Sequence, residues 1–172
     1  IDRHFPGLRG LGHISRVERG QLDAFIAAQR ADQAPDFKVK TKGNAPDLYV
    51  IDTIEPIERN RAAQGFDVGQ EARQRQGVEQ AIATGLPTLT HRITLVQDKQ
   101  KRPGLLFYMP VFAPGVPVER LAPAERKRAL RAIVYTPLVL EELMNGLMDV
   151  AERQLDIMLD EPVQGEPQPD QL

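Results

Sequence analysis

Hydroxyl and guanidinium side chains recur at every second position in one stretch of the sequence. These residues are Thr88, Thr90, Arg92 and Thr94, and Val96 continues the same spacing. Side chains two positions apart in a strand lie on the same face, so these residues would share one face of a strand over 88–96. If that face is buried, the hydroxyls need hydrogen-bond partners and the arginine would pair with a carboxylate or a phosphate. If the face is exposed to solvent, threonine is present because it favours strands. The spacing alone leaves both interpretations open.

Gln74 and Arg75 flank the apolar stripe of a helix predicted over residues 71–84, and that stripe should face the sheet. Arg75 could extend over the edge of the core and pair with a carboxylate such as Asp67, or it could contact a ligand. We also expect Asp67 to cap the start of this helix and Gly85 to end it. The helix therefore supplies two further candidate binding residues.

Tyr108 is the polar exception in a strand predicted over 105–112 that is apolar on both faces. Its hydroxyl would need a partner inside the protein, either in the core or on a ligand. His91 shares the apolar face of the strand 88–96 and is interpreted as a structural histidine. Tyr108 therefore joins the candidates, and His91 does not.

Signatures of catalysis and of metal binding are absent from the sequence. The three histidines are scattered, there are no cysteines, and no HExxH, GxSxG, Walker or GxGxxG motif occurs. The formal net charge of −2 gives no basic field that would attract nucleic acid. With 41% hydrophobic and 27% charged residues, the composition is that of a globular protein. We expect no catalytic residue, no metal, no cofactor and no nucleic-acid partner.

The hydrophobic patterns predict an α+β fold, in which helices flank an antiparallel sheet. Strands are predicted over 8–17, 37–40, 48–54, 88–96, 105–112, 132–135 (broken by Pro137) and 155–159, and helices over 21–30, 71–84, 124–131 and 140–150. Structural corner roles are expected for Glu55, Asn60 and Asp67.

An ordered series of short motifs runs through the chain. It comprises HFPG at 4–7, YVIDTIEP at 49–56, Asn60, GFD at 65–67, Arg75, TG at 84–85, PVF at 110–112, IVYTP at 133–137 and LMNGLM at 143–148. This series resembles the CHASE family, the extracytoplasmic sensor domains of membrane-bound histidine kinases and nucleotide cyclases. The resemblance extends over most of the chain.

The resemblance implies a PAS-like fold with two lobes. A distal ligand-binding lobe would span about 8–115, a smaller and incomplete membrane-proximal lobe about 116–160, and a flexible tail 161–172. The N-terminal stalk helix of the family would be largely missing, so the chain is interpreted as part of a longer inner-membrane receptor that is periplasmic here. The full-length receptor would be a homodimer, attached to the membrane only through flanking segments.

The resemblance also places a pocket on this sequence. In the cytokinin receptors of plants, the pocket uses positions that correspond to Gln74, Thr90, Val96 and Tyr108. Plant receptors have aspartate at the first of these positions and threonine at the last, so cytokinin is not the expected ligand. The predicted ligand-binding set is Gln74, Arg75, Thr90, Arg92, Thr94, Val96 and Tyr108.

The predicted function is the sensing of a small polar or anionic ligand by the extracytoplasmic part of a histidine kinase, diguanylate cyclase or phosphodiesterase. The alternative is a ligand-independent dimerisation or protein-interaction module, in which Leu140, Leu143 and Leu147 or the stalk form the contact. A small soluble hydrolase is a third and weaker alternative.

Overall fold

The computed structural model describes residues 7–32, 34–96 and 100–150, the last helix with side chains as far as residue 146. The strands are β1 (Leu11–Glu18), β2 (Asp47–Glu55), β3 (Thr88–Leu89), β4 (Ile93–Thr94), β5 (Pro103–Phe112) and β6 (Leu130–Val139). The helices are α1 (Leu22–Ala31), α2 (Ile57–Asn60), α3 (Ala72–Thr84), α4 (Pro123–Ala129) and α5 (Leu140–Val150), with 3-10 turns η1 (Arg19–Gln21), η2 (Val68–Gln70) and η3 (Val118–Arg120).

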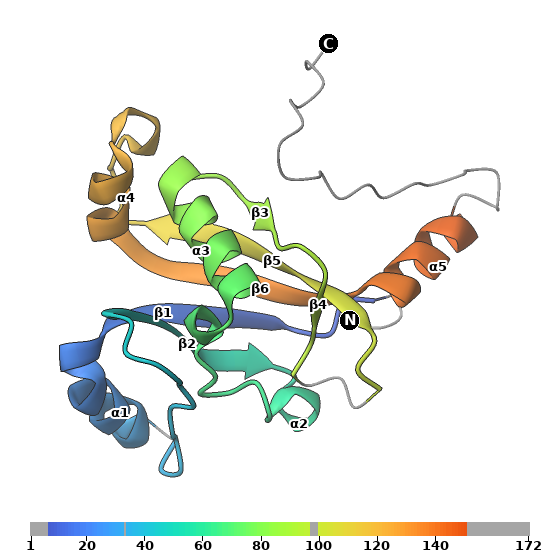
Figure 1. The fold of residues 1–172 in the computed structure, drawn as a ribbon, viewed down its shortest axis with the longest axis horizontal. Helices are drawn as coiled ribbons and strands as arrows, with labels where there is room; N and C mark the ends of the chain where they lie inside the picture. The colour runs from blue at the N-terminus through green and yellow to red at the C-terminus, as the bar shows by residue number, and fades with distance from the viewer. Residues whose placement is uncertain (1–6, 33, 97–99, 151–172) are drawn as a thin grey trace.

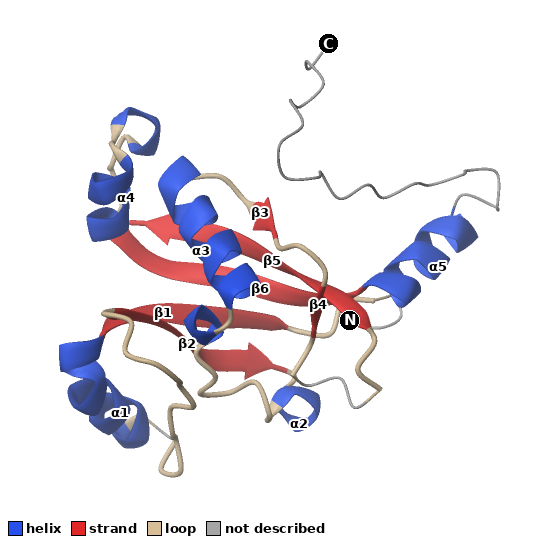
Figure 2. Cartoon of the chain, viewed as in Figure 1, coloured by secondary structure: helices blue, strands red, loops and turns tan. Residues whose placement is uncertain are grey.

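All the strands belong to one antiparallel sheet in the order β2-β1-β6-β5-β3, with β4 also paired to β5 (Figures 1 and 2). The helix α3 lies across one face of this sheet, over β5 and β6, and we call this face the inner face (Figure 1). The predicted α+β class, an antiparallel sheet with flanking helices, is confirmed. In the described part of the chain, no helix combines the length and the hydrophobicity needed to cross a bilayer.

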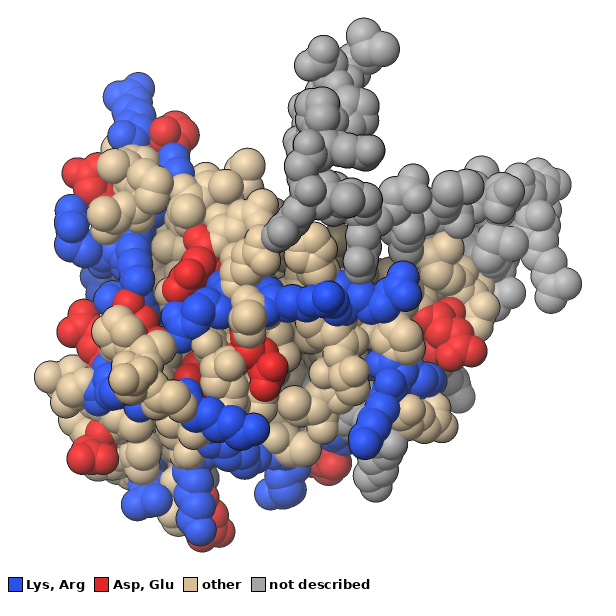
Figure 3. Space-filling model, in the orientation of Figure 1, with Lys and Arg blue, Asp and Glu red and all other residues tan. Residues whose placement is uncertain are grey.

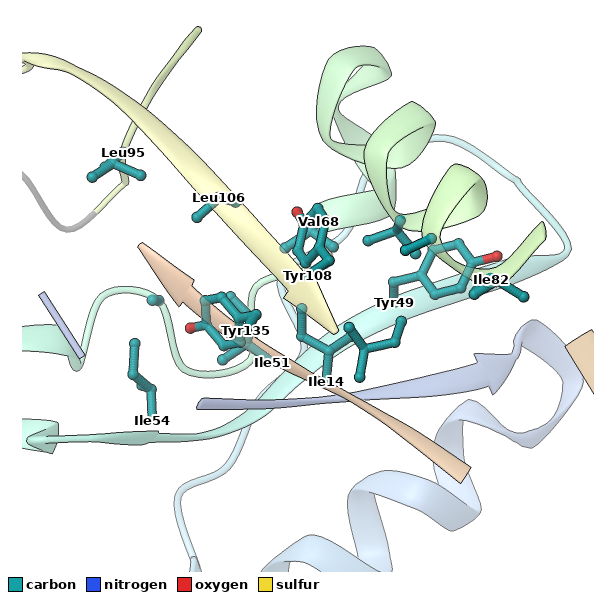
Figure 4. Packing of buried hydrophobic residues seen from close by; sticks show 14 of the residues in the cluster. Ile14, Tyr49, Ile51, Ile54, Val68, Ile82, Leu95, Leu106, Tyr108 and Tyr135 are labelled. Atoms are coloured by element: carbon teal, nitrogen blue, oxygen red, sulfur yellow. The ribbon is translucent and has the colours of Figure 1, made fainter. Parts of the chain in front are cut away.

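The core fills the space between the inner face and α3 (Figure 4). Alternation along the strands brings Ile14, Ile51 and Ile133 to this face, and α3 adds Val78 and Ile82. The buried hydrophobic side chains on the other face of β1 and β2, the outer face, are Val17, Leu48 and Val50, which pack with Leu22 and Phe25 of α1. The two faces therefore carry separate apolar clusters.

The helix α3 lies unusually close to the sheet at Gly77. A Cβ atom at this position would lie 2.9 Å from Thr90 Cγ2 and 3.3 Å from Tyr108 Cε2, so glycine permits the approach. The helix ends as predicted at Gly85, which has φ of 75° and donates its N–H to the Ala81 carbonyl at 2.9 Å. Its start differs from the prediction, because Asp67 caps the preceding turn η2 through Gly69 N.

The predicted strand 88–96 is broken into the two short strands β3 and β4. Between them Thr90 keeps contact with β5: its N–H donates to the Leu106 carbonyl, and its hydroxyl accepts from Leu106 N, both at 2.9 Å. The hydroxyl thus takes the place of a backbone partner, and the strict alternation of side chains ends here. The prediction of one continuous strand was wrong.

The predicted edge strand 37–40 is also not formed. Phe37 is buried against α1, with its ring 5.9 Å from that of Phe25, and only Lys40 forms an isolated bridge, to Phe66. Burial of the aromatic ring overrides the alternation of this short segment. The predicted strand 155–159 and the tail 161–172 lie outside the described residues.

The strand β6 lies in the middle of the sheet, between β1 and β5. It runs through Pro137, where the sequence predicted a break, and Pro137 contributes a carbonyl that accepts from Arg9 N at 2.9 Å. The predicted lobe boundary near residue 115 falls between β5 and β6, which pair along their length. Among the described residues this boundary does not separate two sheets. The helix predicted over 140–150 is confirmed as α5.

The corner residues have the structural roles that were predicted. Asn60 is buried and donates from Nδ2 to the carbonyls of Arg9 and Pro56, at 3.0 Å and 2.9 Å. Glu55 ends β2 and accepts from Ile57 N at 3.2 Å. Asp67 is buried and accepts from Tyr49 N, Gly69 N and the Thr41 hydroxyl.

Candidate functional site

A cavity of about 700 Å³ lies between the first turn of α3 and residues of the ranges 92–96 and 101–103. This volume is in the range of sites that hold small organic ligands. The lining residues are Phe66, Glu71, Ala72, Arg73, Gln74, Arg92, Ile93, Thr94, Val96, Lys101 and Pro103. We call this space the main cavity.

Gln74 is the buried polar side chain of the main cavity. It is only 6% exposed, because α3 turns it toward the sheet together with Val78 and Ala81. Its side-chain amide makes no hydrogen bond with any residue that the structure describes. The amide nitrogen and oxygen are not among the fully buried atoms that have no partner, so they stay accessible and offer a donor and an acceptor to a ligand in the main cavity.

The mouth of the main cavity is basic. Arg73, Arg92 and Lys101 line it, with Glu71 as the acidic member. Arg73 Nη1 donates to the Arg92 carbonyl at 2.9 Å, which ties α3 to the segment before β4. Figure 3 shows basic side chains crossing the middle of this face, over α3 and β4. Such a mouth favours a carboxylate or a phosphate over a cation.

Four of the seven predicted site residues line the main cavity. They are Gln74, Arg92, Thr94 and Val96. Arg92, Thr94 and Val96 are exposed and Leu95 is buried, although Ile93 lines the cavity as well. Thr94 and Val96 are exposed toward the cavity, whereas Gln74 is buried beside it.

The other three predicted residues, Arg75, Thr90 and Tyr108, do not line the main cavity. Arg75 points to the opposite side of α3, where it donates to the Gly69 and Asp47 carbonyls at 2.6 Å and 2.9 Å and stacks 5.4 Å from the Tyr49 ring. Thr90 is engaged with Leu106. Tyr108 is fully buried beneath α3.

A smaller cavity of about 10 Å³ lies deeper, and we call it the floor cavity. It shares Phe66, Gln74, Ile93 and Val96 with the main cavity and is closed by Ile51, Val68, Leu95, Leu106 and Tyr135. Burial raises the pKa of the Tyr135 phenol above its ordinary value, so this side chain is a neutral hydroxyl.

The sequence analysis missed Tyr135 as a site residue. Tyr135 and Tyr108 are directly paired on β6 and β5, so their rings share the inner face. That pairing is set by sheet register, which the sequence does not reveal. Phe66 and Ala72 also line the main cavity and were not predicted, because the direction of their side chains depends on the irregular turn before α3.

Ser15, His13 and Asp52 meet on the outer face of β1 and β2. The Ser15 hydroxyl donates to Asp52 Oδ2 at 2.6 Å, and His13 Nδ1 lies 2.8 Å from both carboxylate oxygens. A hydrolytic triad needs the serine to donate to the histidine, whereas here both residues bond the carboxylate. This cluster therefore gives no support to a hydrolase.

The comparison with protein families agrees with this geometry. The model of the CHASE domain matches residues 1–171, which is essentially the whole chain. No curated protein matches the chain. CHASE domains are non-catalytic extracytoplasmic sensor domains of signalling receptors. The match over residues 1–171 shows that this chain belongs to the CHASE family.

Proposed function

We propose that this domain senses a small polar or anionic ligand in the main cavity, as the periplasmic part of an inner-membrane receptor. The observation that carries the proposal is Gln74, a buried amide that makes no hydrogen bond with the described residues and lines a 700 Å³ space. A ligand at this place satisfies the amide and meets the basic mouth. The receptor would be a dimeric histidine kinase, diguanylate cyclase or phosphodiesterase.

Signalling in this proposal needs no chemical reaction. Walls of the main cavity come from α3 and from residues 92–96, which the hydrogen bond from Arg73 to the Arg92 carbonyl holds together. A ligand that contacts both segments favours whichever of their relative placements it binds more tightly. The shift would reach the output domain through the rest of the receptor.

The test is a thermal-shift and calorimetric screen with mono- and dicarboxylates, sugar phosphates and nucleobases. Ligand binding stabilises the folded domain, by about 2.7 kcal/mol at a concentration of 100 times the Kd. We expect Gln74→Ala to weaken binding at least tenfold, and Ala72→Trp to abolish it by filling the main cavity. Both residues line the cavity, and Ala72 is exposed, so its replacement removes no internal contact.

The matched controls are Arg128→Ala and Ala124→Trp, both at exposed positions on α4. They change charge and volume away from the main cavity and should leave binding unchanged. Equal binding by wild type, Gln74→Ala and Ala72→Trp would place the ligand elsewhere. A screen without any stabilising compound would count against ligand sensing.

A second candidate function is a ligand-independent interaction module. The outer face of the sheet exposes Leu11, Met109 and Val111 by 55%, 41% and 38%. Exposed apolar groups on one face favour contact with a second copy of the chain. Light scattering over a range of concentrations tests this: wild type should dimerise and Met109→Asp should not. A monomer at all concentrations would exclude the contact in this chain.

A further inference from the structure

The Tyr135 hydroxyl is a buried polar group without a partner. The residue is 1% exposed, and its hydroxyl makes no hydrogen bond with the described residues. Its ring packs over Gly12 of β1, where a Cβ atom would lie 2.3 Å from Tyr135 Cε1. The ring position is therefore fixed by the sheet. Such a group normally has a partner, because burial without one costs about 1–3 kcal/mol.

Tyr135 lies at the deep end of the proposed ligand site. Tyr135 closes the floor cavity, which shares four lining residues with the main cavity. Figure 4 shows the Tyr135 hydroxyl projecting away from Tyr108 and α3. The floor cavity of about 10 Å³ is near the smallest size that holds one water-sized group. It suits one hydroxyl or carbonyl oxygen and no larger group.

The two ends of the combined site differ in charge. Three basic residues surround the mouth, whereas the floor is apolar except for the Gln74 amide and the Tyr135 hydroxyl. An ionised group at the floor would lose its hydration without meeting a counter-charge, which is strongly unfavourable. An ion belongs at the mouth, and a neutral group belongs at the floor.

We propose that Tyr135 is a specificity-determining residue, and that the ligand is an acid whose far end carries one neutral hydroxyl or carbonyl group that bonds the Tyr135 hydroxyl. This inference rests on the proposed ligand-sensing function and adds the chemistry of the ligand's buried end. The apolar walls, Phe66, Ile93 and Val96, fit a hydrocarbon or aromatic body between the two polar ends.

Tyr108 provides a matched control for Tyr135. The two residues are cross-strand partners on β5 and β6, and both hydroxyls are buried without a partner among the described residues. Tyr108 lines neither the main cavity nor the floor cavity. Replacement by phenylalanine removes the same atom from both, so only the position relative to the cavities differs.

The experiment measures binding by titration calorimetry with two pairs of probes. The pairs are para-hydroxyphenylacetate with phenylacetate, and para-hydroxyphenylpropionate with phenylpropionate. We expect wild type to bind a hydroxylated probe about tenfold more tightly than its partner, as one neutral hydrogen bond allows. Tyr135→Phe should lose this preference, and Tyr108→Phe should keep it.

Unliganded stability gives a second readout. Removing an unpartnered hydroxyl should leave the Tm of Tyr135→Phe equal to or above that of wild type. A lower Tm would mean that the hydroxyl already has a partner inside the protein, and it would overturn the inference.

The outcomes separate the two proposals. A preference for the hydroxylated probe that survives in Tyr135→Phe, or that is absent in wild type, overturns the role of Tyr135 alone. If neither pair of probes binds while another acid of the wider screen does, the result supports ligand sensing but contradicts the proposed hydroxyl or carbonyl group at the buried end of the ligand. If no compound binds, both proposals fall.

Discussion

The neighbouring residues Gln74 and Arg75 mark two regions of opposite character on α3. On one side, hydrogen bonds of Asp67 and Arg75 connect β2, η2 and α3, and both carboxylate oxygens of Asp67 accept hydrogen bonds. On the other side, Gln74 borders two cavities and makes no hydrogen bond with the described residues. We call the first region the Asp67 corner and the second the Gln74 side.

This contrast distinguishes polar groups that stabilise the fold from polar groups that are available to a ligand. Both regions contain buried polar side chains, so burial alone does not distinguish them. In the Asp67 corner, the protein itself satisfies the polar groups. On the Gln74 side they are held in place without internal partners, as a binding site requires. Mutations should therefore affect stability in the corner and binding on the Gln74 side.

The largest expected effect is that of Asp67→Ala. This change removes the acceptor for Tyr49 N and Gly69 N, each at 2.9 Å, and for the Thr41 hydroxyl at 2.7 Å. Two buried backbone N–H groups lose their partner, so the free energy of unfolding should fall by about 4 kcal/mol. Urea unfolding followed by circular dichroism measures it. The control Asp23→Ala, at an exposed position, should lower the free energy of unfolding by less than about 0.5 kcal/mol. Similar losses in both variants would mean that the hydrogen bonds of Asp67 do not stabilise the fold.

Packing gives the next largest effect. In Gly69→Ala the new Cβ would lie 2.6 Å from Arg75 Nη2 and 3.0 Å from Tyr49 Cδ2, so the free energy of unfolding should fall by about 2–3 kcal/mol. Ala72→Leu adds a larger side chain at an exposed position beside the main cavity and should cost less than about 1 kcal/mol. The same urea experiment compares them. Equal decreases in the free energy of unfolding for Gly69→Ala and Ala72→Leu would mean that the Asp67 corner and the Gln74 side are packed equally tightly.

Arg75→Ala and Gln74→Ala test the comparison at adjacent positions. Loss of the bonds to Gly69 O and Asp47 O and of the stacking on Tyr49 should lower the free energy of unfolding by about 2 kcal/mol in Arg75→Ala. Binding of any compound found in the screen should persist in that variant. Gln74→Ala should show the reverse, with stability within about 1 kcal/mol of wild type and weakened binding. A binding defect in Arg75→Ala, measured well below its Tm, would restore Arg75 as a ligand contact.

The smallest effect concerns the half-exposed cluster on the outer face. The hydrogen bond from His13 to Asp52 raises the pKa of His13 above its ordinary value. The protonated histidine therefore stabilises the folded state fully below about pH 6.5, the ordinary pKa of histidine, and this contribution is lost as the pH rises through the raised value. Unfolding free energies of wild type should decline across that interval, and those of His13→Asn should decline less. Parallel pH profiles for the two proteins would exclude this linkage.

Much of the fold could be predicted from hydrophobic periodicity, because β5 and α5 follow their apolar patterns closely. The break between β3 and β4 could not be predicted, because it depends on the hydrogen bond from Leu106 N to the Thr90 hydroxyl, which forms only when the two residues lie opposite each other. Likewise the continuation of β6 through Pro137 depends on a carbonyl that meets Arg9, far away in the sequence. Local patterns do not contain these long-range pairings.

The candidate site was predictable where it depends on local spacing. The alternation over 92–96 and the helical phase of Gln74 both follow from residue order. Gln74 and Arg75 have different surroundings because a helix places adjacent residues about 100° apart, so Gln74 lines the main cavity while Arg75 contacts the carbonyls of Gly69 and Asp47. Tyr135 required the register between β5 and β6, which becomes known only when the sheet is assembled.

The central position of β6 has a consequence for how the chain folds. The Thr136 hydroxyl donates to the Gly10 carbonyl across a sequence separation of 126 residues, and β6 pairs with both β1 and β5. Contacts of such high contact order slow folding, because a long loop must close before they form. Until β6 has been synthesised, β1 and β5 each keep an open edge. The described sheet is therefore completed at its centre, by the last of its six strands to be synthesised.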